Sequence, residues 1–116
     1  MILKLVCQNA HAAVREVTLD SFPIELGRGV NAGVRIEDRW LSRRHCEISL
    51  VDGAPEVLDL DSRHGTYLQG RKVSREKLLP GQILQLGLTY FQVQYSPADA
   101  SGEIDVSQSD PNLAVA

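Results

Sequence analysis

The feature of the sequence that most constrains its fold is a succession of short runs in which apolar and polar residues alternate. Residues 22–27, for example, place Phe22, Ile24 and Leu26 on one face of an extended chain, which is the pattern of a half-buried strand. Turn-forming glycine, aspartate and asparagine residues separate the runs. Many short strands of this kind predict an all-β sandwich or barrel. The other runs are residues 2–6, 14–19, 34–36, 45–51, 56–60, 66–68, 83–87 and 89–95.

Length and composition limit the chain to one small domain. It has 116 residues, within the range of roughly 100–200 residues for a single domain. A helical turn is indicated only at residues 74–79. No stretch approaches the roughly 20 apolar residues that a membrane helix needs, and no basic segment precedes a long apolar one at the N-terminus. We therefore expect neither a membrane segment nor an export signal. Cys7 and Cys46 are expected to be buried free thiols in a reducing cytoplasm.

Charge is distributed unevenly along the chain. The net charge is -3, so bulk electrostatics do not predict nucleic-acid binding. Residues 97–116 contain four acids, no basic residue and few large apolar side chains, a composition that cannot offset the entropy of ordering. We expect a folded domain over residues 1–96 and a flexible acidic tail or linker over residues 97–116. Ten of the twelve basic residues lie between positions 28 and 77, namely Arg28, Arg35, Arg39, Arg43, Arg44, Arg63, Arg71, Lys72, Arg75 and Lys77.

Three polar segments interrupt the strand pattern, at residues 27–29, 41–45 and 61–66. Loops at one end of a sandwich converge in space even when they are distant in sequence. Converging loops here would gather arginines with a serine hydroxyl and the backbone N–H groups of glycine-containing turns. A phosphate ester, with about -1.5 to -2 charges and three acceptor oxygens, fits such a site. The side chains concerned are those of Arg28, Ser42, Arg43 and Arg63.

The order and spacing of four motifs resemble the forkhead-associated (FHA) domain family. The resemblance covers residues 2–95 and implies an FHA-like β-sandwich of about eleven short strands, with loops at one end that bind phosphothreonine peptides. The motifs are G-R at 27–28, S-R-R-H at 42–45, D-L-D-S-R-H-G-T-Y-L-Q-G at 59–70 and L-P-G-Q-I-L-Q-L-G at 79–87.

The resemblance also implies roles for single residues. Arg28 and Arg63 would contact the phosphate, and Ser42 would donate its hydroxyl to a phosphate oxygen. Arg43 would add backbone or side-chain donors. Residues expected to shape the loops rather than bind the ligand are Gly27, His45, Gly65 and Thr66.

Two positions depart from the family pattern. His64 stands where the family usually has an asparagine that hydrogen-bonds the ligand backbone, and its reach and geometry differ from those of asparagine. Gln69 stands where asparagine often precedes the glycine. Trp40 lies two residues before Ser42 and is either a core residue or a residue that reads the ligand after the phosphothreonine.

The expected function is phosphorylation-dependent protein–protein interaction in signalling. The partner would be a phosphothreonine-containing protein in trans, a substrate of a Ser/Thr kinase, because the tail offers no threonine. Neither a cofactor nor a metal, a membrane or a nucleic acid is expected as a ligand. The main alternative is an FHA-fold scaffold that binds its partner independently of phosphorylation.

Enzymatic and metal-binding alternatives find little support in the sequence. An enzyme would need Ser42 as nucleophile, His45 as base and Asp61 as orienting acid, but no G-x-S-x-G elbow is present. A nucleic-acid site would need aromatic stacking platforms, and only 5% of the residues are aromatic. A metal site would have to draw on residues without ligand spacing, namely His11, His45, His64 and Cys46.

Overall fold

The computed structural model describes residues 1–10 and 15–96, which form eleven strands and contain no helix. The predicted all-β class and strand number are therefore confirmed. The strands are β1 (Leu3–Cys7), β2 (Glu16–Leu19), β3 (Ile24–Gly27), β4 (Val34–Arg35), β5 (Cys46–Val51), β6 (Ala54–Asp59), β7 (Thr66–Leu68), β8 (Arg71–Val73), β9 (Arg75–Lys77), β10 (Ile83–Leu86) and β11 (Thr89–Gln94).

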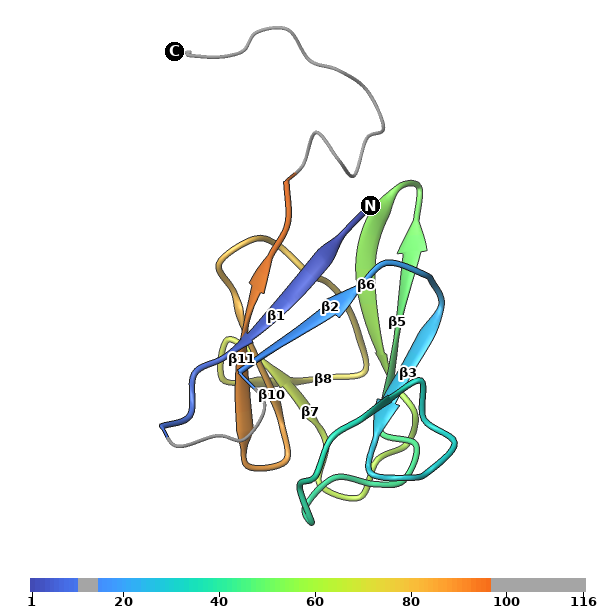
Figure 1. The fold of residues 1–116 in the computed structure, drawn as a ribbon, viewed down its shortest axis with the longest axis vertical. Coiled ribbons are helices and arrows are strands. Elements are labelled where there is room, and N and C mark those ends of the chain that lie inside the picture. Colours follow the sequence, from blue (N-terminus) through green and yellow to red (C-terminus); the bar gives the residue numbers. More distant parts are fainter. Residues whose placement is uncertain (11–14, 97–116) are drawn as a thin grey trace, which may run out of the picture.

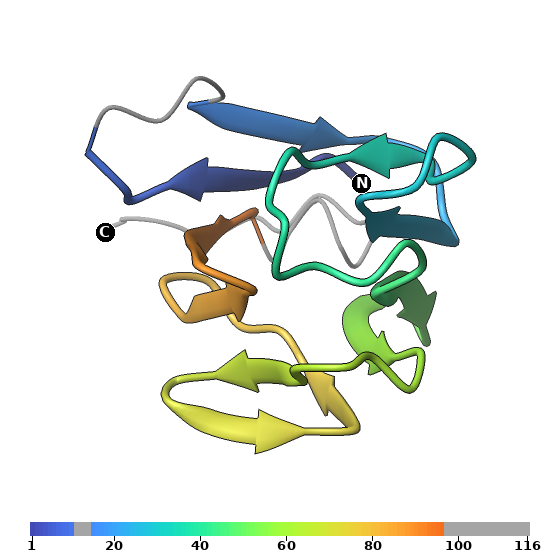
Figure 2. The same ribbon diagram turned by 90° about the horizontal axis from the view of Figure 1, so that it is seen from below.

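The strands form two sheets that pack as a sandwich (Figure 1). The six-stranded sheet has the order β2-β1-β11-β10-β7-β8, and the five-stranded sheet has the order β4-β3-β5-β6-β9. Only the β3–β4 pair is parallel, and the other neighbouring strands are antiparallel. Figure 2 shows the blue β1–β2 pair and the yellow-green β7–β8 pair at opposite edges of the larger sheet. The connections between sheets leave several loops at one end of the sandwich.

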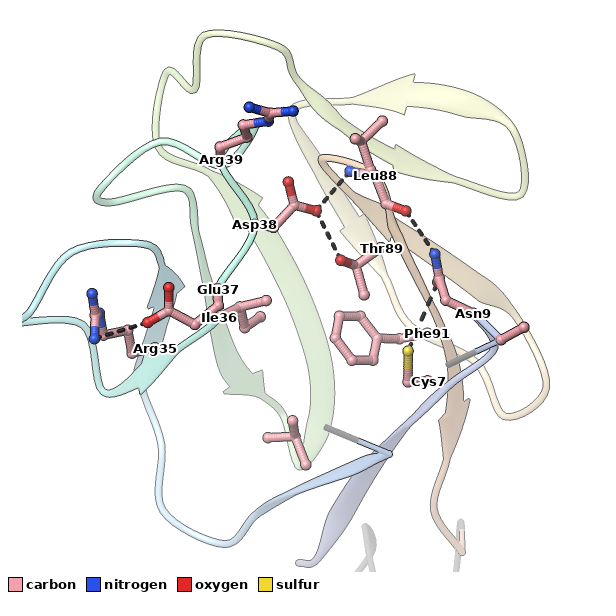
Figure 3. A pocket seen from close by; sticks show the side chains of 12 residues that line it. Cys7, Asn9, Arg35, Ile36, Glu37, Asp38, Arg39, Leu88, Thr89 and Phe91 are labelled. Carbon is pink, nitrogen blue, oxygen red and sulfur yellow. Dashed lines mark hydrogen bonds and ion pairs between the residues drawn. The ribbon is translucent and has the colours of Figure 1, made fainter. Parts of the chain in front are cut away.

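One of these loops, the β4–β5 loop (residues 36–45), is fastened to the larger sheet by a buried aspartate. Asp38 is 8% exposed. Its carboxylate accepts hydrogen bonds from the Leu88 N–H (2.7 Å) and the Thr89 hydroxyl (2.8 Å), as Figure 3 shows. It also accepts the N–H of Trp40 at 2.8 Å. Because Leu88 and Thr89 lie on the β10–β11 hairpin, Asp38 fixes the position of the segment that leads to Ser42.

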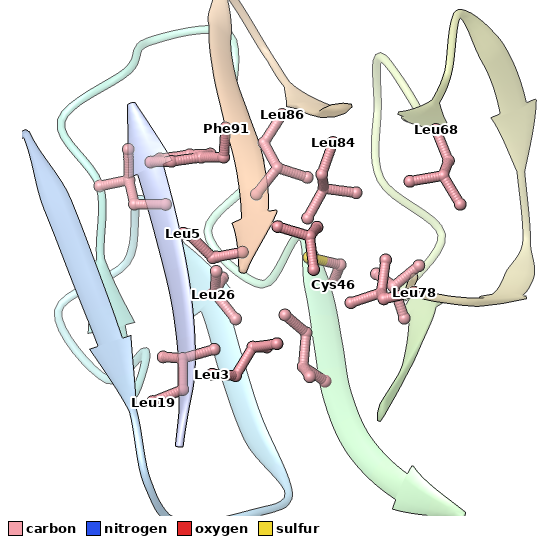
Figure 4. Close-up of a cluster of buried hydrophobic side chains, with 14 of the residues drawn as sticks. Leu3, Leu5, Leu19, Leu26, Cys46, Leu68, Leu78, Leu84, Leu86 and Phe91 are labelled. Carbon is pink, nitrogen blue, oxygen red and sulfur yellow. The ribbon is translucent and has the colours of Figure 1, made fainter. Parts of the chain in front are cut away.

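The core lies between the two sheets and is built from the alternating side chains of both (Figure 4). In β1 the buried residues are Leu3, Leu5 and Cys7, and the intervening side chains are exposed or half-buried. The expectation of two buried free thiols is confirmed for Cys7 and Cys46. Burial of this apolar area is the main force that holds the sheets together. Across both sheets the other buried apolar side chains include Leu19, Leu26, Ile48, Val57, Leu68, Leu78, Leu84, Leu86, Phe91 and Val93.

The helical turn predicted at residues 74–79 is wrong, because the chain forms β9 there and β8 just before it. Strands β8 and β9 are edge strands, paired with β7 and β6 on one side only. Nearly all their side chains are exposed. A strand without a buried face has no apolar alternation, so the sequence carried no period-2 signal for either one.

No helix in the described part of the chain is long and apolar enough to cross a membrane. The expectation of a flexible acidic tail or linker concerns residues 97–116, which lie outside the described residues. His11 also lies outside them.

Candidate functional site

Three loops meet at one end of the sandwich, the lower end in Figure 1, away from the N-terminus. They are the β3–β4 loop (residues 28–33), the β4–β5 loop and the β6–β7 loop (residues 60–65). These loops contain the three polar segments in which the sequence placed its candidate residues. The structure therefore brings together the three polar segments that the sequence analysis singled out.

The β3–β4 and β4–β5 loops are joined through their backbones. The Arg28 N–H donates to the Ser42 carbonyl (3.0 Å), and the Gly29 N–H donates to the Arg43 carbonyl (3.1 Å). A Cβ placed on Gly27 would lie 2.1 Å from the Arg43 carbonyl oxygen. Only glycine allows so close an approach, so Gly27 lets the two loops lie against each other.

Ser42 connects this pair of loops to the third. Its Oγ accepts the N–H of Arg63 at 2.9 Å. A hydroxyl group has one hydrogen to donate as well as lone pairs to accept. The Ser42 hydroxyl therefore keeps its own hydrogen for an acceptor brought to the same place, such as an anionic oxygen.

The Arg28 side chain is held at the junction of the loops. Its Nε donates to the Leu41 carbonyl at 3.1 Å. The two terminal nitrogens of the guanidinium lie beyond this bond and carry four further N–H donors. Since one end of the side chain is fixed, less rotational freedom is lost when the other end binds a ligand.

Four arginines line a hollow beside these loops, and two of the four form ion pairs with glutamates. Arg44 forms an ion pair with Glu25 (2.7 Å), which lowers the pKa of that carboxyl, and Arg35 pairs with Glu37 (2.9 Å). The other two lining arginines, Arg28 and Arg43, have no carboxylate partner in residues 1–10 and 15–96.

Arg63 is likewise exposed and without a carboxylate partner in the described part of the chain. The three joined loops thus carry three exposed arginines, Arg28, Arg43 and Arg63, and Ser42 lies where these loops are joined. Such a group of donors is suited to an oxyanion, and best to one that accepts several hydrogen bonds.

His45 is fully buried beneath the loops. Its Nδ1 accepts the N–H of Ser42 (3.1 Å), so Nε2 carries the ring hydrogen in the neutral form. Nε2 then donates to the carbonyl of Gly65 at 3.0 Å. One side chain thereby ties the β4–β5 loop to the β6–β7 loop. Gly65 itself has φ of +90°, a conformation that strains residues with a Cβ.

The hydrogen bonds of His45 also bear on the enzyme alternative. Both ring nitrogens are bonded to backbone groups of Ser42 and Gly65, so neither is directed at the Ser42 hydroxyl as a general base would be. Asp61 is exposed on the β6–β7 loop and does not orient the imidazole. Within residues 1–10 and 15–96, no three histidine, cysteine, aspartate or glutamate side chains gather into a possible metal site.

Asp59 organises the β6–β7 loop, a role that the sequence analysis did not assign. Its carboxylate accepts hydrogen bonds from the Ser62 hydroxyl and N–H and from the Thr66 hydroxyl at 2.7 Å. Ser62 Oγ in turn accepts the Gly65 N–H at 3.0 Å. Burial acts to raise the pKa of Asp59, but the hydrogen bonds from Ser62 and Thr66 outweigh it and the pKa is lowered. The signal in the sequence was the spacing D-x-x-S, typical of a side chain that closes its own turn.

Trp40 is 44% exposed, so the interpretation as a core residue is wrong. Its ring lies 4.4 Å from the ring of His64, centroid to centroid, at an interplanar angle of 40°. The two rings border a hollow whose other lining residues include Gly65, Tyr67 and Leu88. Aromatic and apolar atoms thus line a hollow formed in part by the loops that carry Ser42 and Arg63.

Comparison with known proteins agrees with this geometry. Residues 24–87 match the model of the FHA domain family. Over 107 residues the chain is 29% identical to the glycogen accumulation regulator GarA of Mycobacterium tuberculosis, covering 92% of this chain and 65% of that protein. Over 83 residues it is 32% identical to the oxoglutarate dehydrogenase inhibitor of Corynebacterium diphtheriae, covering 72% of this chain and 58% of that protein. The chain therefore spans less than two thirds of the length of these relatives.

Solved structures extend the likeness to three dimensions. An FHA domain from a structural and functional analysis of phosphothreonine-dependent FHA domain interactions superposes with a TM-score of 0.75 at 28% identity, covering 84% of this chain and 99% of that one. The FHA domain of FhaA, solved in complex with the intracellular domain of Rv3910, gives a TM-score of 0.71 at 28% identity and covers 79% and 99% of the two chains.

Proposed function

Because the chain belongs to the FHA domain family, in which phosphothreonine-dependent interactions are described, we propose that it binds phosphothreonine peptides of a partner protein. The observation that carries the proposal is the junction at Ser42. There three loops are joined and a hydroxyl hydrogen is available. The same loops carry the exposed residues Arg28, Arg43 and Arg63, which have no carboxylate partner in the described residues. The protein would act as an interaction module and would catalyse no reaction.

In this proposal the phosphate lies over Ser42 and faces Arg28 and Arg63. The Ser42 hydroxyl donates to one oxygen, and the guanidinium of Arg28 donates to others through its terminal nitrogens. Arg43 supplies further donors from its exposed position. Charge-assisted hydrogen bonds of this type contribute about 1.5–3 kcal/mol each. Removal of the phosphate would therefore lower the affinity for the peptide strongly.

The peptide around the phosphothreonine would be held by Trp40 and His64. His64 occupies the position of the usual asparagine, and its contact with Trp40 supports a role in which the ring pair supplies apolar surface beside the ligand backbone. We propose that Trp40 favours an apolar or aromatic residue about three positions after the phosphothreonine.

We propose that the FHA domain comprises residues 1–96, because strands β1 and β11 lie inside the larger sheet although the family match covers only residues 24–87. Residues 97–116 are proposed to be a tail or linker. The relatives are named as regulators and inhibitors, and we propose that this chain similarly regulates a protein phosphorylated by a Ser/Thr kinase. Two buried thiols without a disulfide are consistent with a reducing compartment such as the cytoplasm.

One observation favours the alternative of a phosphate-independent scaffold. Gln69, at the second departure from the family pattern, uses its side-chain oxygen to accept the N–H of Ile83 at 2.6 Å. A side chain committed in this way to the sheet contributes less to gripping a peptide. The alternative keeps the fold and the partner surface but removes the role of the phosphate.

An oriented phosphothreonine peptide library, screened on the purified protein, tests the proposal. We expect selection of phosphothreonine over threonine, with an apolar or aromatic preference about three positions after it. A Trp40→Ala variant should lose that preference but still select phosphothreonine. Equal recovery of phosphorylated and unphosphorylated pools would favour the scaffold instead.

A further inference from the structure

Lys72 lies on the edge strand β8, outside the three loops, yet its side chain reaches the candidate site. A Cβ placed on Gly65 would lie 2.9 Å from Lys72 Cε and 3.4 Å from its Cδ. The aliphatic part of the lysine therefore crosses directly over the backbone of the β6–β7 loop. Its ammonium, one bond beyond Cε, therefore lies close to the loop that carries Arg63 and His64.

The sheet determines this placement. Lys72 is directly opposite Tyr67 in the β7–β8 pair, so the two side chains project from the same face of the six-stranded sheet. Tyr67 Cε1 would lie 3.3 Å from the same Cβ on Gly65. Tyr67 also lines the hollow bordered by Trp40 and His64. Lys72 thus contacts Gly65 and projects from the same sheet face as Tyr67, and both of these residues line that hollow.

The charge of Lys72 is available to a ligand. Lys72 is exposed and forms no ion pair with any carboxylate in residues 1–10 and 15–96. Its stem is already packed on Gly65, so the cost in side-chain entropy of holding the ammonium in place is reduced. A lysine at the rim of an interface adds selectivity through charge complementarity.

We propose that Lys72 is a specificity-determining residue that selects an acidic side chain close to the phosphothreonine of the ligand. The inference rests on the proposed function. It adds a second anionic group to the ligand, which would be a phosphothreonine peptide with an aspartate or glutamate at a position that lies over Gly65 and Tyr67. The carboxylate would pair with Lys72 while the phosphate occupies Ser42 and Arg28.

The test uses a set of phosphothreonine peptides with glutamine at every flanking position and single glutamates scanned through them. Affinities are measured for the wild-type protein, Lys72→Met and Lys77→Met. Methionine retains most of the unbranched stem over Gly65 but removes the charge. Lys77, on β9 of the other sheet, is an exposed lysine without an ion pair in the described residues and serves as the matched control. Melting temperatures verify that both variants are folded.

We expect one position, or two adjacent ones, at which glutamate improves affinity roughly two- to fivefold over glutamine, the range of an exposed ion pair. The gain should persist in Lys77→Met and vanish in Lys72→Met, with the all-glutamine peptide unaffected. Absence of any such position, or an equal loss for all peptides in Lys72→Met, would overturn the inference; the second result would make Lys72 a phosphate contact. If the unphosphorylated form of the all-glutamine peptide binds the wild-type protein as tightly as the phosphorylated form, the proposed function itself fails.

Discussion

At the scale of single residues, the candidate site depends on side chains that are held by one hydrogen bond and keep further donors free. Ser42 accepts a backbone N–H from a neighbouring loop and retains a hydrogen to donate. The Nε of Arg28 donates to the Leu41 carbonyl, and its terminal nitrogens remain available to a ligand. Each side chain is therefore positioned by the fold before a ligand arrives, which reduces the entropy that binding must overcome.

Replacement of Arg28 by alanine tests the proposed phosphate contact. We expect Arg28→Ala to weaken phosphopeptide binding by roughly 2–5 kcal/mol, as for a desolvated charge pair that loses one partner, while the melting temperature changes little. Calorimetry measures both. Arg44→Ala is the matched control, because Arg44 lines the same hollow but is paired with Glu25. Equal affinities of wild type and Arg28→Ala would remove Arg28 from the site.

Replacement of His45 distinguishes a structural role of this residue from direct contact with the ligand. Because His45 is fully buried and joins Ser42 to Gly65, His45→Ala should lower the melting temperature as well as the affinity. Leaving two backbone groups without partners costs about 1–3 kcal/mol for each buried group. A variant with wild-type thermal stability but lost affinity would make His45 a direct ligand contact instead.

At the scale of elements, the β6–β7 loop is held in shape by Asp59. We expect Asp59→Asn to destabilise the protein by about 1–3 kcal/mol at pH 7, because an amide NH2 replaces one acceptor oxygen. Affinity should fall too, since the loop carries Arg63. Urea unfolding measures the first effect. Asp61→Asn, an exposed carboxylate on the same loop whose φ of +60° asparagine tolerates, should change stability by less than about 0.5 kcal/mol.

The lowered pKa of Asp59 gives this effect a definite dependence on pH. A carboxyl with a depressed pKa in the folded state stabilises the protein above its ordinary pKa of about 3.9, and the contribution is lost as pH falls through the lower folded value. The stability difference between wild type and Asp59→Asn should therefore shrink below about pH 4. A difference that stays constant down to pH 2 would contradict the role of the ionised carboxylate.

Sequence reasoning succeeded for elements with a buried face and failed for those without one. Strand β7 was predicted at its observed bounds, residues 66–68, because Thr66 and Leu68 are buried and Tyr67 between them is not. Strands β8 and β9 were missed because their side chains project into solvent.

The same limit applied to the site. Its loops were recognisable from arginine, serine and glycine spacing, but the exposure of Trp40 and the reach of Lys72 across Gly65 depend on how distant strands pair. Neither feature could be predicted from the residues adjacent in the sequence.

At the scale of the whole molecule, the chain combines a net charge of -3 with a concentration of arginines in the loops at one end. An acidic ligand is attracted to that end, and the attraction decays over about 8 Å at physiological salt. The acidic residues after position 96 are a potential competitor in the same chain. Residues 97–116 contain no threonine, since the only threonines of the chain are Thr18, Thr66 and Thr89.

Deletion of residues 97–116 tests whether the ligand comes from another protein. We expect phosphopeptide affinity to stay within about threefold of the full chain, roughly 0.6 kcal/mol, because a screened charge interaction without a phosphothreonine competes weakly. Isothermal calorimetry of both forms at two salt concentrations gives the answer. A much larger gain on deletion would identify the tail as an autoinhibitory segment and contradict binding in trans.

The central claim is that the phosphate on threonine makes the interaction. Its most direct test is the dissociation constant of one library-selected peptide in phosphothreonine, threonine and phosphoserine forms. With at least two charge-assisted hydrogen bonds at stake, each of about 1.5–3 kcal/mol, we predict that the threonine form binds at least about a hundredfold more weakly, and that phosphoserine, which lacks the methyl group, lies between. Equal dissociation constants for the phosphothreonine and threonine forms would contradict the account and leave a scaffold that does not recognise phosphate.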